Sequence, residues 1–123
     1  MKQINKTDVV IIGGGHAGIE ASNIVSKLGK NNLLVTLDLS AIGRMSCNPA
    51  IGGVAKGQMV REIDMLGGLM GRVADTSGLQ YKVLNKSKGR SVWSPRAQID
   101  KRVYEKNISN HILNQKKIKT YCG

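Results

Sequence analysis

Aromatic residues, cysteines and long apolar runs are all scarce in this sequence. Its 123 residues include no Phe, one Trp and three Tyr, so a buried core has to be built from Ile, Leu, Val and Met. The two cysteines, Cys47 and Cys122, cannot supply a disulfide framework. Because no apolar stretch is long, we expect neither a signal peptide nor a membrane span, and we expect a cytoplasmic, reducing compartment.

Acidic residues are also few. Eight Asp and Glu stand against 19 Lys and Arg, which gives a formal net charge of +11. Such an excess attracts polyanions, including nucleic acid. A general bias toward Lys, Ile and Asn explains the charge equally well. The length suits one small domain.

The first forty residues predict a βαβ unit. Residues 8–12 are a short β-branched run that ends at glycine, as in a buried parallel strand. Residues 17–28 have helical spacing, and residues 33–37 form a second apolar run. We therefore expect an α/β fold with a parallel sheet. The helix is expected to bury one face, formed by Ile19, Ile24 and Leu28.

The rest of the chain is predicted to mix short helices and strands. Residues 59–66 read as a helix that buries Met59, Ile63 and Leu66, and a short helix follows through residue 75. Residues 79–84 and 90–93 are predicted to pair as a β-hairpin around the turn 85–89. The last elements are a helix over 97–113 and a strand over 118–122. The buried positions expected in that helix are Ile99, Val103, Ile108 and Ile112.

Glycines 13, 15 and 18 form a dinucleotide-binding pattern between the first strand and the first helix. In that context Gly13 allows a tight turn, Gly15 lets the backbone approach a pyrophosphate, and Gly18 lets the helix pack close to the strand. Asp38 follows about 20 residues later, where it would accept hydrogen bonds from ribose hydroxyls. A solvated loop aspartate is an equal alternative.

Cys47 lies in the polar, turn-forming run M-S-C-N-P-A-I-G-G. We expect Pro49 to begin a short helical turn capped by Asn48, which would place the thiol beside a helix N-terminus, where a thiolate is stabilised. A buried, inert cysteine is the alternative. The nearby glycines, Gly52, Gly53 and Gly57, suit close approach to a ring or a phosphate. Cys122 is expected to be structural.

Four runs together resemble the GidA/MnmG family, whose members are FAD-dependent enzymes that modify the wobble uridine of certain tRNAs. They are D-V-V-I-I-G-G-G-H-A-G, M-S-C-N-P-A-I-G-G-V-A-K-G, E-I-D-M-L-G-G-L-M and L-N-K-S-K-G-R-S-V-W-S-P-R-A-Q-I-D. The resemblance implies a Rossmann-like FAD-binding domain with a small β-hairpin insertion, and Cys47 as the catalytic cysteine. It also implies that one loop holds the FAD pyrophosphate, namely Gly13, Gly14, Gly15, His16, Ala17 and Gly18.

The resemblance further implies partners and co-substrates for the full-length family. Members work with the GTPase MnmE, as a heterotetramer built on a homodimer of the full-length chain. Together they install an aminomethyl or carboxymethylaminomethyl group at uridine C5, with carbon from methylenetetrahydrofolate and electrons from NADH. A thiolate that adds to uracil C6 would activate C5. The sequence does not separate that role of Cys47 from a redox or acid/base role.

A basic cluster follows the cofactor segment. Phosphate contacts are expected for Lys86, Lys88, Arg90 and Arg96, with Lys82, Lys101 and Arg102 in the same cluster. A solvated charged face is the alternative. Trp93 is expected to stack on a base or a flavin, or to pack in the core. No metal site is predicted.

The family's length predicts that residues 1–123 are only the N-terminal part of an FAD-binding domain. We therefore expect the isolated chain to be catalytically inert and to bind FAD weakly. Two alternatives stay open, another FAD- or NAD-dependent oxidoreductase with a redox cysteine, and a non-catalytic remnant.

Overall fold

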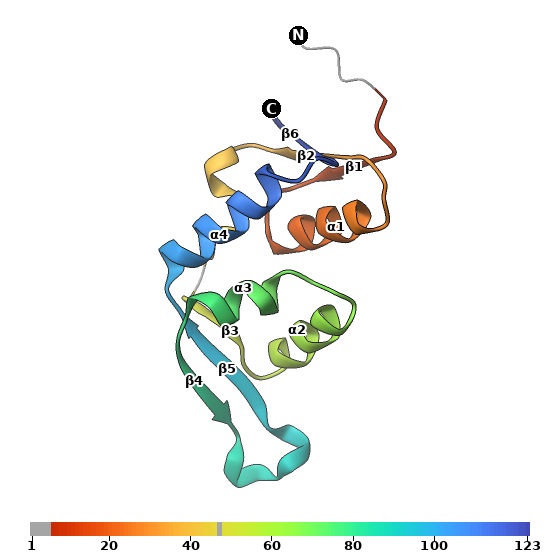
Figure 1. Ribbon diagram of the computed structural model, residues 1–123. Helices are drawn as coiled ribbons and strands as arrows, with labels where there is room; N and C mark the ends of the chain where they lie inside the picture. The colour runs from red at the N-terminus through yellow and green to blue at the C-terminus, as the bar shows by residue number, and fades with distance from the viewer. Residues whose placement is uncertain (1–5, 47) are drawn as a thin grey trace. The chain divides into compact units, whose positions relative to one another are not determined.

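The structure is a computed structural model that describes residues 6–46 and 48–123. The chain divides into two compact units, one formed by residues 1–44 and 108–123 and the other by residues 45–107. Figure 1 shows the order of helices and strands along the chain. Each unit has its own three-stranded sheet, and each is described separately below.

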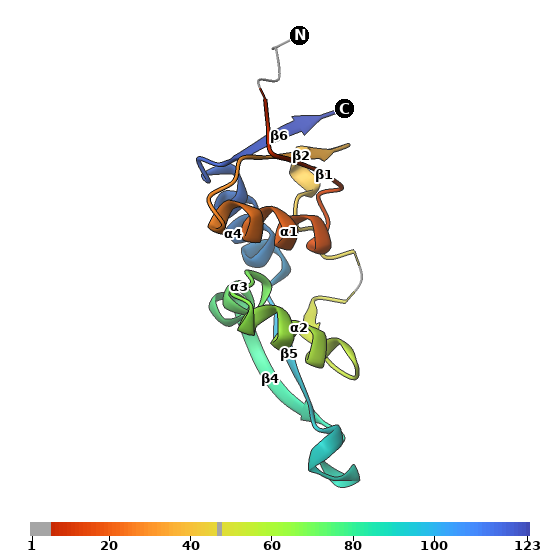
Figure 2. The same cartoon turned by 90° about the vertical axis from the view of Figure 1, so that its right-hand side faces the viewer.

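The first unit is built on a parallel sheet. Its strands are β1 (Val9–Ile12), β2 (Asn32–Thr36) and β6 (Ile118–Cys122), in the order β1-β2-β6. Both pairings are parallel. Helix α1 (His16–Lys27) connects β1 to β2, and the short helix η1 (Leu39–Ala41) follows β2. Figures 1 and 2 show α1 and the end of α4 (Lys101–Leu113) on the same side of this sheet. The predicted βαβ unit and parallel sheet are confirmed.

The core of the first unit lies between this sheet and these helices. Ile19 of α1, Leu34 of β2, and Ile108 and Ile112 of α4 are fully buried. Each buried aliphatic side chain of this size stabilises the fold by roughly 1.5–3 kcal/mol. The face of α1 that packs inward continues through Ser22, whose small side chain permits a close approach to the sheet.

Several expected core positions of the first unit are wrong. Ile24 and Leu28 of α1 are exposed, because the buried face of the helix runs through Ile19, Ser22 and Asn23 instead. Strand β1 is not fully buried, since Val10 and Ile12 are 54% and 85% exposed. Val10 and Ile12 point to the same face of the strand, and this face is exposed at both positions.

The second unit has an antiparallel sheet in the order β3-β5-β4. The strands are β3 (Ala50–Gly52), β4 (Gly78–Leu84) and β5 (Ser94–Ile99), and the helices α2 (Lys56–Met65) and α3 (Met70–Ser77) connect β3 to β4. The short helices η2 (Lys86–Lys88) and η3 (Arg90–Val92) lie at the tip of the β4–β5 hairpin, as Figures 1 and 2 show. The buried side chains of this unit include Leu69, Val73, Ile99 and Tyr104.

The hairpin is confirmed, but its return strand and the following helix begin later than predicted. Residues 90–92 form η3, and the strand that pairs with β4 is β5. Helix α4 (Lys101–Leu113) therefore starts after Ile99. Its start is set by Asp100, whose Oδ1 accepts hydrogen bonds from the backbone N–H groups of Arg102 (3.0 Å) and Val103 (3.1 Å).

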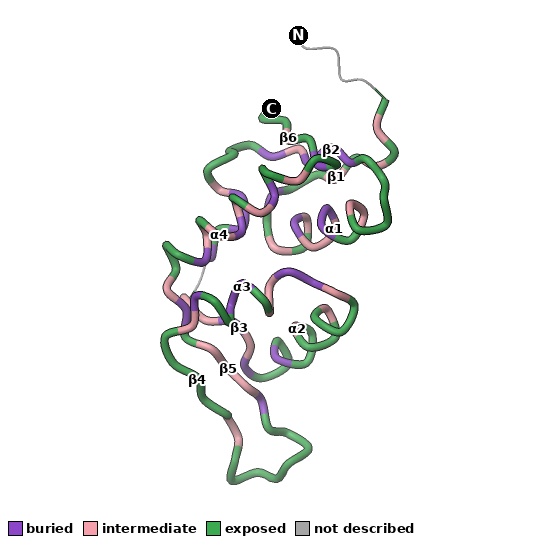
Figure 3. Tube along the Cα trace, in the orientation of Figure 1, coloured by how far each residue is buried: buried purple, intermediate pink, exposed green. Residues whose placement is uncertain are grey.

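Helical spacing also misidentified buried positions in the second unit. Met59 and Leu66 are 61% and 76% exposed, and Val103 is exposed while its neighbour Tyr104 is fully buried. Figure 3 shows that most of α2 and most of β4 are exposed. A helical repeat identifies two faces of a helix, whereas the neighbouring elements decide which face is covered.

Candidate functional site

The glycine loop between β1 and α1 has the geometry that its pattern predicts. Gly13 adopts a positive φ of +108°, which glycine tolerates and other residues rarely adopt, and its N–H donates to the Val35 carbonyl at 2.8 Å. A Cβ on Gly18 would overlap the carbonyl oxygen of Gly13. The loop can close tightly only because both positions lack a side chain.

Gly15 lies where a ligand could reach the backbone. No described heavy atom lies within 4 Å of a Cβ built there. Gly15 is also the N-cap of α1 and offers no side chain to cap it, and no acidic residue stands in the first turn. The first N–H groups of a helix have no partner within the helix, and they carry the positive end of its dipole. This end of α1 is therefore suited to an anion such as a pyrophosphate.

The remaining loop residues have different surroundings. Gly14 is buried, its carbonyl accepts a hydrogen bond from the Gly43 N–H at 2.9 Å, and a Cβ there would lie 2.9 Å from Thr36 Oγ1. His16 is half-buried at the first position of α1, and Ala17 is exposed. Gly14 thus joins the loop to β2 and the η1 segment, while Gly15 and Ala17 face solvent.

Asp38 lies beside this loop. It follows β2, and the Thr36 hydroxyl that borders Gly14 donates to the Asp38 carbonyl at 3.3 Å. The Asp38 carboxylate is exposed and accepts hydrogen bonds from the Ser40 hydroxyl (2.7 Å) and backbone N–H (2.8 Å). Those two bonds, with a smaller contribution from Arg44 at 3.5 Å, lower the pKa of Asp38. The carboxylate is held ionised at the carboxyl end of the sheet, where such folds bind ligands.

Cys47 lies outside the described residues, so the structure does not test its placement. Its neighbours Ser46 and Asn48 are exposed. The expected helical turn at Pro49 is wrong, because strand β3 begins at Ala50, whose N–H donates to the Asn48 carbonyl at 2.7 Å. That strand pairs with β5, and the pairing holds this segment extended. Cys122 is exposed, and its thiol donates to the Leu37 carbonyl at 3.3 Å.

The second glycine run packs against β5. A Cβ on Gly52 would overlap the Pro95 carbonyl oxygen, to which the Gly53 N–H donates at 2.9 Å. Ala55 then has φ +64° and ψ −48°, and the Lys56 N–H donates to the Val54 carbonyl at 2.8 Å, which makes a strained γ-turn before α2. The structure accounts for Gly52 by strand packing.

The predicted basic residues separate into two groups. Lys86 and Arg96 line a cavity of about 530 Å³ in the second unit, together with Lys82, Arg61 and Tyr81. Lys88 and Arg90 are exposed at the hairpin tip, and the Arg90 guanidinium lies 5.8 Å from the centroid of the Trp93 ring. Trp93 is 39% exposed, and its Nε1 donates to the Lys86 carbonyl at 3.2 Å.

Tyr81 and Arg61 are site candidates that sequence reasoning missed. The alternation along β4 puts Tyr81 and Val83 on one face of that strand, which is a usable signal for Tyr81. Arg61 comes from helix α2, and only the tertiary structure brings it to the cavity.

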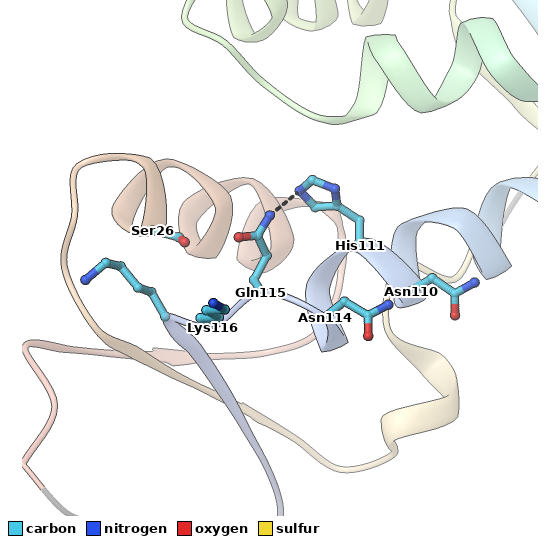
Figure 4. Close-up of a pocket in the computed structure, with 7 residues that line it drawn as sticks. Ser26, Asn110, His111, Asn114, Gln115 and Lys116 are labelled. Carbon is cyan, nitrogen blue, oxygen red and sulfur yellow. Dashed lines mark hydrogen bonds between the residues drawn. The ribbon is translucent and has the colours of Figure 1, made fainter.

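A second cavity, of about 570 Å³, lies in the first unit. Figure 4 shows Ser26 of α1 opposite polar side chains from the end of α4 and the turn that follows it. His111 and Gln115 are joined by a hydrogen bond of 3.2 Å. The cavity borders the C-terminal ends of two helices, whose dipoles favour cations and disfavour anions. Its two lysines, Lys116 and Lys117, therefore do not by themselves make it an anion site.

The described residues, 6–46 and 48–123, contain no cluster of three or more His, Cys, Asp or Glu side chains able to hold a metal ion. Within the same residues, no helix has the length and apolar character needed to cross a membrane.

A parallel sheet whose first strand runs through a glycine loop into a helix defines a Rossmann-like dinucleotide-binding domain. The family model described as glucose inhibited division protein A matches residues 8–122. The chain belongs to this family, and the resemblance inferred from its motifs is confirmed.

Named relatives share about half of their aligned residues with the chain. A tRNA uridine 5-carboxymethylaminomethyl modification enzyme MnmG of Protochlamydia amoebophila is 53% identical over 105 residues, which cover 85% of this chain and 17% of the relative. The mitochondrial 5-taurinomethyluridine-tRNA synthase subunit MTO1 of Macaca fascicularis is 51% identical over 107 residues, 87% of this chain and 16% of the relative.

A solved structure agrees with these relatives. GidA of Aquifex aeolicus superposes with a TM-score of 0.91 at 48% identity, covering 98% of this chain and 20% of that one. The chain thus spans about a fifth or less of the length of these proteins. Its relatives are named as tRNA-modifying enzymes, and the chain is a member of that enzyme family.

Proposed function

We propose that this chain binds the adenosine and pyrophosphate end of FAD and forms part of an enzyme that modifies the wobble uridine of tRNA. The observation that carries the proposal is the loop geometry. Gly13 makes the turn, Gly18 allows the close packing, and Gly15 leaves the start of α1 open to solvent. The membership in a family with tRNA-modifying relatives supports the substrate class.

The residues present fit FAD at this position. A phosphate needs an approachable backbone at a helix N-terminus, and Gly15 provides it with no described atom within 4 Å of its missing side chain. FAD, when bound, supplies electron transfer. Gly13, Gly14, Gly15, His16, Ala17 and Gly18 form the proposed cradle, and the N–H groups at the start of α1 would orient the pyrophosphate.

Asp38 is the proposed partner of the ribose. It lies at the carboxyl end of β2 beside the loop, and its lowered pKa keeps it ionised as a hydrogen-bond acceptor. Two of its bonds now go to Ser40. A carboxylate has about four lone-pair sites, so accepting from Ser40 leaves capacity for ribose hydroxyls.

The remaining assignments follow the family. Cys47 is the proposed catalytic cysteine, and Lys86, Lys88, Arg90 and Arg96 are proposed to contact tRNA phosphates. The whole protein is proposed to use NADH and methylenetetrahydrofolate, to pair with MnmE, to install an aminomethyl or carboxymethylaminomethyl group, and to work in the cytoplasm. The isolated chain is proposed to be catalytically inert.

Ligand competition tests the cofactor assignment. We expect ADP to compete with FAD for the chain in a calorimetric titration, because the loop recognises the adenosine diphosphate half. Riboflavin and FMN lack the adenosine and should not compete. Equal competition by FMN, or no effect of Asp38→Asn on FAD affinity, would contradict the proposed binding mode.

The reaction is tested in the whole protein that carries this segment. We expect Cys47→Ser to abolish the modification of the wobble uridine, measured by mass spectrometry of tRNA nucleosides. The control is Cys122→Ser, at a cysteine 75 residues further along the chain, and it should leave the modification intact. If Cys47→Ser abolished a thiol-dependent reductase activity and left tRNA modification unchanged, the alternative of another flavin oxidoreductase would replace this one.

A further inference from the structure

One face of the β4–β5 hairpin carries two cations and two amides. Lys82 and Arg96 are directly opposite each other in the antiparallel register, and Gln80 and Gln98 form the neighbouring pair, two residues away along each strand. Residues directly opposite each other lie on the same face of a sheet, and so do residues two positions apart along a strand. These four side chains therefore form one cluster, which we call the cationic face. Three of them are exposed, and Arg96 is half-buried.

The two helices of this unit pack on the other face of the hairpin. Tyr81 and Pro95 lie on that face, because each is one position along its strand from a residue of the cationic face. The Tyr81 hydroxyl donates to the Asp75 carbonyl of α3 at 3.3 Å, and Pro95 Cδ lies 3.7 Å from a Cβ built on Gly57 of α2. Figures 1 and 2 show the hairpin extending past both helices. Residues of both faces border the cavity of about 530 Å³, so the strand register, and not the cavity, defines the cationic face.

The positive charge of the cationic face has no carboxylate partner. Between Asp75 and Asp100 the sequence holds five Lys and Arg and no Asp or Glu. Within residues 6–46 and 48–123, neither Lys82 nor Arg96 forms a salt bridge. Like charges in directly opposite positions destabilise a sheet. The pair therefore lowers the stability of the fold, and an anion bound by both side chains would remove that repulsion.

The anion that suits this face is a phosphate of a nucleic-acid backbone. Lysine and arginine neutralise phosphates, and glutamine side chains also bond to phosphate and sugar oxygens. The four side chains of the cationic face include no aromatic ring, so they offer no surface on which a base could stack. Their chemistry fits contacts to the backbone of a nucleic acid and not to its bases.

We propose that the cationic face holds the sugar–phosphate backbone of the substrate RNA, with one phosphate shared by Lys82 and Arg96. Gln80 and Gln98 donate hydrogen bonds to adjacent backbone oxygens. Contacts of this kind position a nucleic acid without reading its sequence. The proposal rests on the proposed function for the class of ligand. It adds Lys82, Gln80 and Gln98 to the RNA-binding surface, and it assigns Arg96 a phosphate that a second cation shares.

Salt-dependent fluorescence anisotropy of the chain with a labelled RNA stem-loop tests the shared phosphate. We expect the double variant Lys82→Gln, Arg96→Gln to reduce the slope of log affinity against log salt concentration by about 1, because one phosphate contact is lost. A slope of about 0.9 for each contact corresponds to a roughly 5-fold loss of affinity at about 0.15 M salt relative to about 1 M. A reduction of about 2 would mean two separate contacts and would overturn the shared phosphate.

Matched variants separate this face from overall charge and from folding. Val83→Gln, at the neighbouring position on the opposite face, and Lys119→Gln, at an exposed lysine of β6, should leave RNA affinity nearly unchanged. Lys82→Arg should retain wild-type affinity. Lys82→Gln should weaken binding and leave the melting temperature equal or higher, because its repulsion with Arg96 is removed. A lower melting temperature would mean that Lys82 acts through folding, and it would overturn the proposal.

Two further measurements test the identity of the ligand. Stem-loops of one shape and two different sequences should lose affinity equally in the double variant, because backbone contacts do not read bases. Unequal loss would overturn a backbone site. Vesicles of phosphatidylserine present phosphates of another source. If the double variant lost vesicle binding and kept RNA binding, the cationic face would contact a membrane surface and not RNA.

Failure of this proposal and failure of the proposed function give different results. Wild-type affinity and salt dependence in the double variant would overturn the cationic face as an RNA site, even if the whole protein modifies tRNA. If the whole protein did not modify tRNA, while RNA binding still depended on Lys82 and Arg96, the proposed function would be contradicted and the cationic face would stand.

Discussion

A paired substitution in the glycine loop separates folding from cofactor binding. Gly15→Ala and Gly18→Ala add the same methyl group at the N-cap of α1 and within its first turn. At Gly18 the new Cβ overlaps the Gly13 carbonyl oxygen, a backbone atom that cannot rotate away. At Gly15 the new Cβ meets no described atom within 4 Å, and φ is −74°, which alanine adopts freely.

The expected magnitudes follow from these two environments. At Gly18, overpacking against the backbone lowers the free energy of unfolding by about 1–3 kcal/mol or more. The higher helix propensity of alanine raises it by about 1 kcal/mol. A net loss of about 2 kcal/mol is a large share of a stability of roughly 5–15 kcal/mol. At Gly15, alanine is a poorer N-cap than glycine, which lowers the stability by up to about 1 kcal/mol. Alanine also reduces the conformational entropy of the unfolded chain, which raises the stability by about 0.4–1 kcal/mol. We expect no net change there.

Urea denaturation followed by circular dichroism, with titration of FAD or ADP, measures both effects. Gly18→Ala should lower the denaturation midpoint. Gly15→Ala should keep the wild-type midpoint and lose affinity for both ligands, because its methyl group stands where the pyrophosphate approaches the helix. Gly29→Ala, at a positive φ of +78° in open space, is the control that loses stability but not binding. Wild-type stability in Gly18→Ala, or wild-type affinity in Gly15→Ala, would refute this reasoning.

Three further substitutions have expected outcomes. Ser40→Ala should raise the pKa of Asp38 toward its ordinary value, seen by NMR titration of the carboxyl carbon. The lowered pKa contributes stability above about pH 4, and this contribution is lost as pH falls through the folded-state pKa, so the variant should be less stable than wild type at neutral pH and the two should converge in acid. An unchanged titration would mean that Ser40 does not hold the carboxylate. The unpaired edge at β1 in the described sheet leads us to expect self-association of the chain, and Ile12→Thr, at an exposed position of that strand, should reduce it in sedimentation velocity; unchanged association would exclude this edge as its cause. Ala55→Gly should stabilise the chain by about 1 kcal/mol, because glycine relieves the positive φ at Ala55, and a lower urea midpoint would contradict the strain assigned there.

Much of the fold follows from local sequence. The strand at 8–12, the glycine loop and the first helix are recognisable because β-branched residues, glycines and helical spacing each act over a few residues. The strand at 118–122 and the hairpin after residue 79 follow in the same way. The family also follows, since its motifs are contiguous runs, and the match over residues 8–122 confirms it.

Errors arose where one local pattern fits two structures. Alternating residues after Pro95 suit a strand or the start of a helix, and pairing with β4 over Ser94–Ile99 decided for the strand. Pro49 suits a helix start or an extended segment, and pairing of Ala50 with Gln98 decided again. In both cases the deciding partner is distant in sequence, so local spacing carries no record of it.

The sequence by itself determined the βαβ unit, the glycine loop, the basic character and the family of this protein, because each depends on residues that are adjacent or regularly spaced. Only the tertiary structure decided which faces are buried, why Gly18 admits no side chain, and that Lys82, Arg96 and Tyr81 share one cavity. Those properties depend on atoms from separate elements coming within contact distance, and contact distance is a property of the folded chain.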